Sequence, residues 1–198
     1  MNFLIIALVV LAGLAVYLFS TYNRFVTTKT RIKASIQEIG NQLKRQAELI
    51  PNLVESVKGY MKHEKKIFKD LTDARRMIVQ AVEKGDAQKM VNASVAANRA
   101  LAPIQAVFES TPQLQAVQTT NKLMDELRDT ADKVMYARRT LIDLTADYNV
   151  MIVAFPSNLI ARIFSFQQQP GLQLPPSAKT EATQVKKEEM KTPQVKLD

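Results

Sequence analysis

Apolar and polar positions divide the chain into three parts. Residues 3–19 form an unbroken apolar run, FLIIALVVLAGLAVYLF. From Tyr22 onwards apolar residues recur at steps of three and four, the period of amphipathic helices. After residue 166 this period is lost and Pro, Gln and charged residues dominate. The pattern predicts an all-α protein: an N-terminal transmembrane helix (1–21) that continues into an antiparallel four-helix bundle with long helices (22–166), then a disordered C-terminal tail (167–198).

Prolines and glycines set the expected boundaries of the bundle helices. Pro51 lacks an amide donor, so the first helix is expected to stop near Ala47 and a tight turn to occupy residues 48–50. The second helix is then expected to run from Pro51 to Val82. Gly85 is placed to end it in the left-handed conformation, and Asp86 to cap the third helix, which is expected to reach about residue 108 with a kink at Pro103.

The fourth helix, expected from Pro112 to just before Pro156, has the clearest periodicity in the chain. Steps of four and three define one stripe, which is typical of bundle packing. Its positions are Leu123, Leu127, Thr130, Val134, Ala137, Leu141, Leu144, Tyr148, Met151 and Phe155. An intermolecular coiled coil fits the same stripe, but three other amphipathic helices need partners, which favours an intramolecular bundle.

The apolar run fits a membrane span better than a cleaved secretory signal. No basic residue precedes it, and its small residues lie inside the run rather than at a cleavage site. Four basic residues follow it closely: Arg24, Lys29, Arg31 and Lys33. The positive-inside rule therefore predicts an N-terminus outside and a bundle in the cytoplasm.

A short amphipathic segment, SNLIARIFSF, follows Pro156. Antiparallel helices would return this segment to the membrane side, against the inner leaflet or the turn between the second and third helices. We therefore expect a membrane interface made by Arg24, Lys29, Ile160, Arg162 and Phe164. The tail after it could dock a partner, although a solvated linker is the simpler interpretation.

Composition argues against several classes of chemistry. The net charge of +8 is concentrated near the span, and no nucleic-acid-binding motif accompanies it. His63 is the only histidine and there is no cysteine, so a zinc site is not expected. Glu126, Asp129 and Asp132 are interpreted as ion-pair partners, with a divalent-cation site as the alternative. Without a nucleophile elbow or a Gly-rich phosphate loop, we expect no enzyme, metal or cofactor.

The stretch from Leu43 to Glu64, LKRQAELIPNLVESVKGYMKHE, resembles the LemA family of bacterial membrane-anchored helical proteins. Further matches are Tyr22-Asn23, Ala74-Arg75, Tyr136-Ala137-Arg138-Arg139, Asp147-Tyr148-Asn149, Ala154-Phe155-Pro156 and Ala161. The resemblance implies a single span with an external N-terminus and a cytoplasmic bundle, hence the bacterial inner membrane. It implies no established activity. The chain departs from the family pattern at Ile36, Gly40, Gln46, Ala131, Leu141 and Ile142, which indicates a divergent branch.

Two Tyr-Asn pairs are the most informative polar candidates. Tyr22 and Asn23 open the first helix, Tyr148 and Asn149 lie near the end of the fourth, and the antiparallel arrangement predicts that the pairs lie close together. They could form structural contacts or a partner-binding site. The same two interpretations apply to Asn52, Tyr60 and Arg75.

The leading hypothesis from sequence is a non-catalytic scaffold or adaptor. Its expected partners are membrane lipids and unidentified proteins, with an oligomer possible and no nucleic acid. The alternative is a protein that organises or stabilises membrane through its basic first helix and terminal amphipathic segment. A third class, an enzyme or protease cofactor, has no residue constellation behind it.

Overall fold

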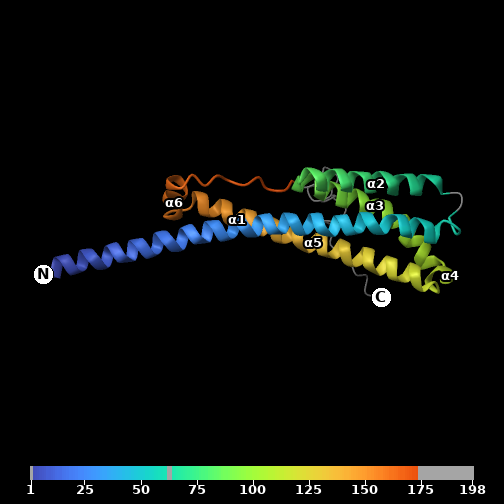
Figure 1. The fold of residues 1–198 in the computed structure, drawn as a ribbon, viewed down its shortest axis with the longest axis horizontal. Coiled ribbons are helices and arrows are strands. Elements are labelled where there is room, and N and C mark those ends of the chain that lie inside the picture. Colours follow the sequence, from blue (N-terminus) through green and yellow to red (C-terminus); the bar gives the residue numbers. More distant parts are fainter. Residues whose placement is uncertain (1, 62–63, 174–198) are drawn as a thin grey trace, which may run out of the picture.

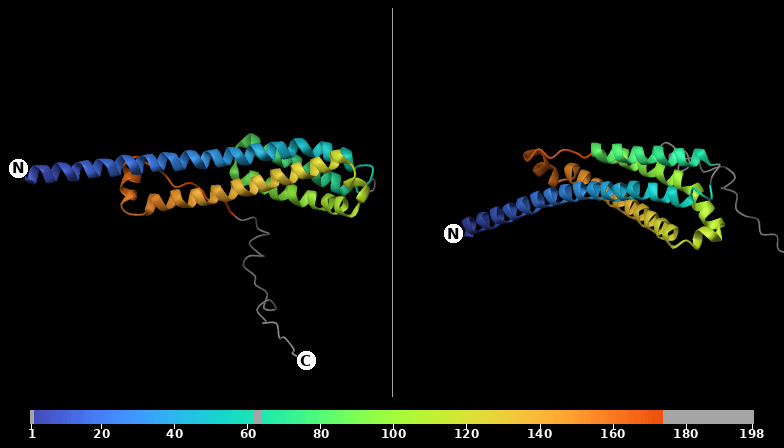
Figure 2. Two further views of the ribbon diagram at one scale, coloured as in Figure 1. Left: turned by 90° about the horizontal axis from the view of Figure 1, so that it is seen from below. Right: turned by 45° about the vertical axis from the view of Figure 1, so that its right-hand side comes forward.

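The computed structural model describes residues 2–61 and 64–173, and these residues form helices and no strand. The long helix α1 (Asn2–Val57) and the long helix α5 (Gln118–Val153) lie antiparallel, as Figures 1 and 2 show. Helices α2 (Lys65–Lys84) and α3 (Ala87–Ser110) form an antiparallel hairpin that packs on the far part of α1. The one-turn helix α4 (Pro112–Gln115) joins α3 to α5, and α6 (Ser157–Ile163) follows α5. The predicted all-α fold is confirmed.

Helix α1 both carries the apolar run and supplies one side of the bundle. Its 56 residues correspond to about 84 Å at 1.5 Å per residue. Within the described residues, it is the single helix long and apolar enough to cross a membrane, and none of the residues in its most apolar window is buried. Farther along, Phe25, Ile32, Ile39 and Leu43 are buried against the rest of the bundle.

Pro51 does not end the first helix, contrary to the sequence expectation. In an α-helix residue 51 would donate its N–H to the carbonyl of Ala47, and proline cannot. The side chain of Arg75, on α2, donates its Nε–H to that same carbonyl at 2.9 Å. A partner from another helix therefore replaces the missing donor, and α1 continues to Val57. The expected turn at 48–50 is wrong, and α2 begins at Lys65 rather than at Pro51.

The turn between α2 and α3 matches the sequence prediction. Gly85 adopts φ of 63° and donates its N–H to the carbonyl of Val82. Asp86 accepts a hydrogen bond from the backbone N–H of Lys89 at 3.0 Å, as an N-cap residue does. Helix α3 then runs through Pro103 to Ser110.

Most of the predicted stripe on the fourth helix is the core face of α5. Leu127, Thr130, Val134, Ala137, Leu141, Leu144, Tyr148 and Met151 are buried. The stripe is buried within one chain, since α5 packs mainly on α1. Two expectations were wrong: α5 begins at Gln118 instead of Pro112, and Phe155, beyond the helix end at Val153, is 80% exposed.

Candidate membrane-proximal site

Five aromatic side chains gather at the end of the bundle where α6 lies beside α1, here called the base. The ring centroids of Tyr22 and Phe164 are 4.7 Å apart, and Phe166 stacks on Phe25 at 4.7 Å. Tyr148 meets Phe25 edge-on at 5.7 Å. The structure thus brings Tyr22 and Tyr148 into one cluster, through Phe25 and Phe166. This cluster fastens the chain after α6 to both long helices.

Tyr148 is the polar exception within this cluster. Its side chain is fully buried, and its hydroxyl has no hydrogen-bond partner among the described residues. Burial raises the pKa of this phenol. Tyr148 therefore stays neutral at physiological pH and acts here as a packing residue.

Asn149 binds the segment that follows the aromatic cluster. We call residues 167–173 the strap. The Asn149 Nδ2 donates to the carbonyl of Gln169 at 2.9 Å, and the Gln169 N–H donates to Asn149 Oδ1 at 2.9 Å. Gln88 forms the same kind of reciprocal pair with the backbone of Gln173, at 3.2 and 2.8 Å. Two side-chain amides therefore hold the strap as a neighbouring strand would.

The strap differs from the sequence expectation that a disordered tail begins at residue 167. Residues up to 173 lie along the bundle, from the base to the α2–α3 turn (Figure 1). Residues 174–198 of the expected tail lie outside the described residues. Composition alone gave no signal for the strap, because its backbone is held by Asn149 and Gln88 rather than by its own side-chain pattern.

The α5–α6 corner exposes a cluster of apolar side chains at the base. Phe155 is 80% exposed and Ile163 is 68% exposed, and Val153 and Leu159 are also exposed. Because Phe164 contacts Tyr22, this corner lies about 4.5 Å along α1 from Phe19, the last residue of the apolar run. The corner is therefore at the level where α1 leaves the apolar run.

Three of the predicted interface residues are exposed at or near the base, namely Arg24, Arg162 and Phe164. The prediction for Ile160 is wrong, because its side chain is only 5% exposed and packs into the core instead of facing a membrane. Sequence periodicity could not show that α6 turns Ile160 inward and Leu159 and Ile163 outward.

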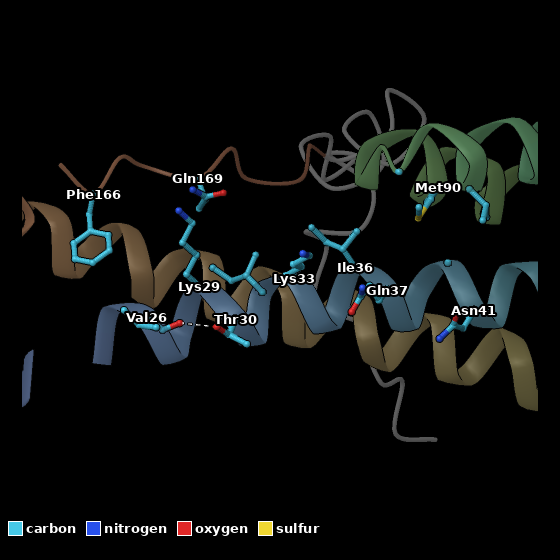
Figure 3. A pocket seen from close by; sticks show the side chains of 14 residues that line it. Val26, Lys29, Thr30, Lys33, Ile36, Gln37, Asn41, Met90, Phe166 and Gln169 are labelled. Carbon is cyan, nitrogen blue, oxygen red and sulfur yellow. Dashed lines mark hydrogen bonds between the residues drawn. The ribbon is translucent and has the colours of Figure 1, made fainter. Parts of the chain in front are cut away.

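Lys29, the remaining interface candidate, lines a groove of about 1190 Å³ along α1 (Figure 3). The groove runs from the aromatic residue Phe166 to the α2–α3 turn, where Gly85 lines it together with Met90 of α3. That turn was expected near the membrane but lies level with Gly40 of α1, where a Cβ would be 3.5 Å from Met90. Gly40 is 18 residues past Tyr22, about 27 Å along the helix.

The other polar candidates lie away from the base or make no contact there. Asn23 is exposed, and Asn52 and Tyr60 are exposed near the end of α1. Arg75 bonds the Ala47 carbonyl, as described above. These residues do not converge with the aromatic cluster into one site.

The protein-family comparison decides the family. The model of the LemA family matches residues 35–186, most of the chain. The chain is a member of the LemA family. It is also similar to the magnetosome protein MamQ 2 of Paramagnetospirillum magneticum, with 25% identity over 88% of this chain and 74% of that protein. The magnetosome protein MamQ of Magnetospirillum gryphiswaldense is 24% identical over 83% of this chain and 69% of the relative.

Family membership agrees with the resemblance carried by the Leu43–Glu64 stretch. Together with the exposed apolar part of α1, it indicates a membrane-associated protein. Neither the family nor these relatives bears the name of an enzyme.

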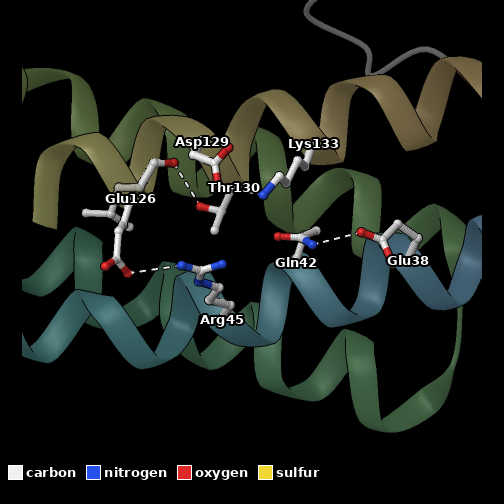
Figure 4. Close-up of polar contacts among 8 residues, drawn as sticks. Glu38, Gln42, Arg45, Glu126, Asp129, Thr130 and Lys133 are labelled. Atoms are coloured by element: carbon white, nitrogen blue, oxygen red, sulfur yellow. Dashed lines mark hydrogen bonds and ion pairs between the residues drawn. The ribbon is translucent and has the colours of Figure 1, made fainter. Parts of the chain in front are cut away.

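Two of the three carboxylates interpreted as ion-pair partners, Glu126 and Asp129, form such pairs (Figure 4), whereas Asp132 forms none with the described residues. Glu126 on α5 pairs with Arg45 on α1 at 3.3 Å, and Asp129 pairs with Lys133 at 2.7 Å. In the parts of the chain that the structure describes, no group of three His, Cys, Asp or Glu residues is arranged to hold a metal ion. His63 lies outside the described residues.

Proposed function

We propose that the protein is a non-catalytic scaffold, anchored by one span in the bacterial inner membrane with its bundle in the cytoplasm. The observation that carries this proposal is an apolar stripe on the outer face of α5, the face turned away from the core. Its exposed members are Met135, Ile142 and Val150, with Tyr136 beside them. These side chains follow one face of α5 at intervals of seven and eight residues, and apolar surface left exposed on a folded helix is available to a partner.

The geometry of α1 supports a scaffold. The helix is continuous from the apolar run into the bundle, so no loop separates the anchor from the folded part. A continuous helix fixes the orientation of the bundle relative to the span, so the exposed stripe of α5 is held at a constant distance from the bilayer. An adaptor that presents a partner to the membrane benefits from this rigidity.

The charge pattern supports the proposed orientation. Arg24, Lys29, Arg31 and Lys33 follow the apolar run, and Arg24 and Arg31 lie exposed on α1. Basic residues beside a span favour the cytoplasmic side. Because the natural chain lacks cysteine, single-cysteine variants at Asp73 or Tyr136 give a clean topology test. Labelling of intact cells by a membrane-impermeant maleimide would refute the cytoplasmic bundle.

A photocrosslinking experiment tests the scaffold. A photoreactive amino acid replaces Ile142, on the stripe, or Gln80, an exposed control position on α2. We expect reproducible protein adducts from the stripe and none of these from the control. Met135→Ser should weaken the stripe adducts without changing the thermal melt. Identical adducts at both positions, or no protein adduct at the stripe, would refute the scaffold.

The α5–α6 corner favours a second candidate function, organisation of the membrane itself. Phe155 and Ile163 are exposed at the level where α1 leaves the apolar run, with Arg162 exposed beside them. Insertion of such side chains into one leaflet would deform the bilayer locally. Under this function, Phe155→Ser with Ile163→Ser should abolish any remodelling of reconstituted vesicles, while the α5 stripe adducts persist. Unchanged remodelling would refute it.

A further inference from the structure

The groove beside α1 arises because the two helix pairs differ in length. In the far part of the bundle, the α2–α3 hairpin covers one face of α1. The hairpin ends at Gly85, level with Gly40, while α1 and α5 continue to the base. Over this remaining stretch the strap replaces two helices. The groove of about 1190 Å³ is the space that this thinner cover leaves.

The groove combines apolar walls with positive charge. Val26, Ile36 and Met90 line it, and Phe166 closes its base end. Lys29 and Lys33 extend from α1 toward the strap side of the groove, as Figure 3 shows. No lining residue carries a carboxylate, and within residues 2–61 and 64–173 neither lysine makes an ion pair.

The spacing of the two lysines is unfavourable without a ligand. Lys29 and Lys33 are four residues apart, so their ammonium groups share one face of α1 and repel each other. An anion placed between them would relieve this repulsion and make charge-assisted hydrogen bonds. The other polar side chains of the lining, Thr30, Gln37, Asn41 and Gln169, are neutral, so the two lysines carry the charge of the groove.

We propose that this groove binds a long-chain carboxylate taken from the adjacent bilayer. The carboxylate lies between Lys29 and Lys33, and the hydrocarbon chain runs from there toward the base, against Val26 and Phe166. Such a ligand has a single polar end, so it needs no further hydrogen-bond partners along the groove, unlike a peptide backbone. The lysines lie about 10 and 16 Å past Tyr22 along α1, close enough to the base for exchange with the membrane. This site goes beyond the scaffold and does not depend on it.

Photolabelling of the full chain tests the proposal. The protein is reconstituted in nanodiscs of phosphatidylcholine and exposed to a diazirine-bearing palmitate or to the matching diazirine-bearing hexadecanol, and labelled residues are mapped by mass spectrometry. We expect the carboxylate to label residues 26–41 about tenfold more than the alcohol does, because only the carboxylate forms charge-assisted bonds. Val26→Trp should lower groove labelling and leave labelling of the apolar run unchanged.

A pair of matched variants separates the groove from general membrane electrostatics. Lys29→Gln with Lys33→Gln should remove the preference for the carboxylate. Arg24→Gln with Arg31→Gln removes the same charge from exposed positions outside the groove and should preserve the preference. Circular dichroism confirms that each variant is folded.

Several results would overturn the proposal. These are equal labelling of the groove by both probes, equal loss of preference in the two double variants, or labelling confined to the apolar run. A groove that neither probe labels, because an acidic peptide or the chain's own C-terminal residues occupy it, would overturn it as well.

Discussion

The hydrogen bond from Arg75 to the Ala47 carbonyl should stabilise the fold because Pro51 cannot donate to that carbonyl. The bond joins residues 28 positions apart and spans α2 and α1 at 2.9 Å. Arg75→Ala leaves the carbonyl of a residue that is 3% exposed without a donor. Such a loss costs about 1–3 kcal/mol. Because the guanidinium is partly open to water, we expect the lower half of this range, about 1–1.5 kcal/mol.

A double-mutant cycle isolates the mechanism. Pro51→Ala restores a backbone N–H that can donate to Ala47 within α1, so Arg75→Ala should cost little in that background. The expected coupling between the two positions is about 1 kcal/mol. For a chain of this size, Arg75→Ala alone should lower Tm by about 2–6 °C.

The assay is thermal unfolding of the full chain in detergent, followed by far-UV circular dichroism. Hydrogen exchange supplies a local readout, because amides of α1 near Pro51 should exchange faster in Arg75→Ala. Arg76→Ala is the matched control: Arg76 is exposed and, among the residues that the structure describes, forms an ion pair only with Asp73 of its own helix, at 2.9 Å. We expect the control to change stability by less than about 0.5 kcal/mol.

Equal destabilisation by Arg75→Ala with and without Pro51 would refute the reasoning. It would mean that Arg75 stabilises the bundle through packing or charge and not by replacing the donor that proline lacks.

Three further predictions concern the strap, the base and the α2–α3 turn. Asn149→Leu removes the reciprocal bonds to the strap backbone, so limited proteolysis within the strap should become faster, whereas Gln88→Leu should free only its far end. A spin label at Phe155 should report burial in lipid in reconstituted vesicles, and a label at Ile160 should report an immobile protein interior; water-like accessibility at Phe155 would contradict the proposed depth of the base. The Lys89 backbone N–H, followed by the Lys89 side chain, holds the pKa of Asp86 below its ordinary value of 3.8. The stabilisation by this carboxylate is therefore complete above about pH 4 and is lost as the pH falls through the lower folded pKa. Asp86→Asn should flatten this acidic part of the stability–pH profile. A variant whose stability falls with acid as steeply as that of the parent would contradict this prediction.

The sequence by itself determined that the fold is helical and where three local features lie. These features are the apolar run, the stripe of α5 that faces the core and the Gly85–Asp86 turn. Each depends on neighbours one to four residues away, so local periodicity and capping chemistry suffice to predict it. The same holds for the approach of Tyr22 to Tyr148, which follows from antiparallel order. The helical fold and the end of the bundle at which Tyr22 and Tyr148 join one aromatic cluster therefore agree with the sequence prediction.

Only the tertiary structure decided where α1 ends, what covers the base and how α6 is turned. From sequence, Pro51 predicts a helix boundary. In the structure Arg75, distant in the chain, supplies the missing donor and the helix continues. The composition of the strap predicts a disordered tail, whereas in the structure Asn149 and Gln88 bind its backbone. Ile160 and Ile163 have similar side chains in one short helix, and contact with α1 and α5 buries the first and leaves the second exposed. In each case the deciding partner is remote in sequence, so no local pattern contains it.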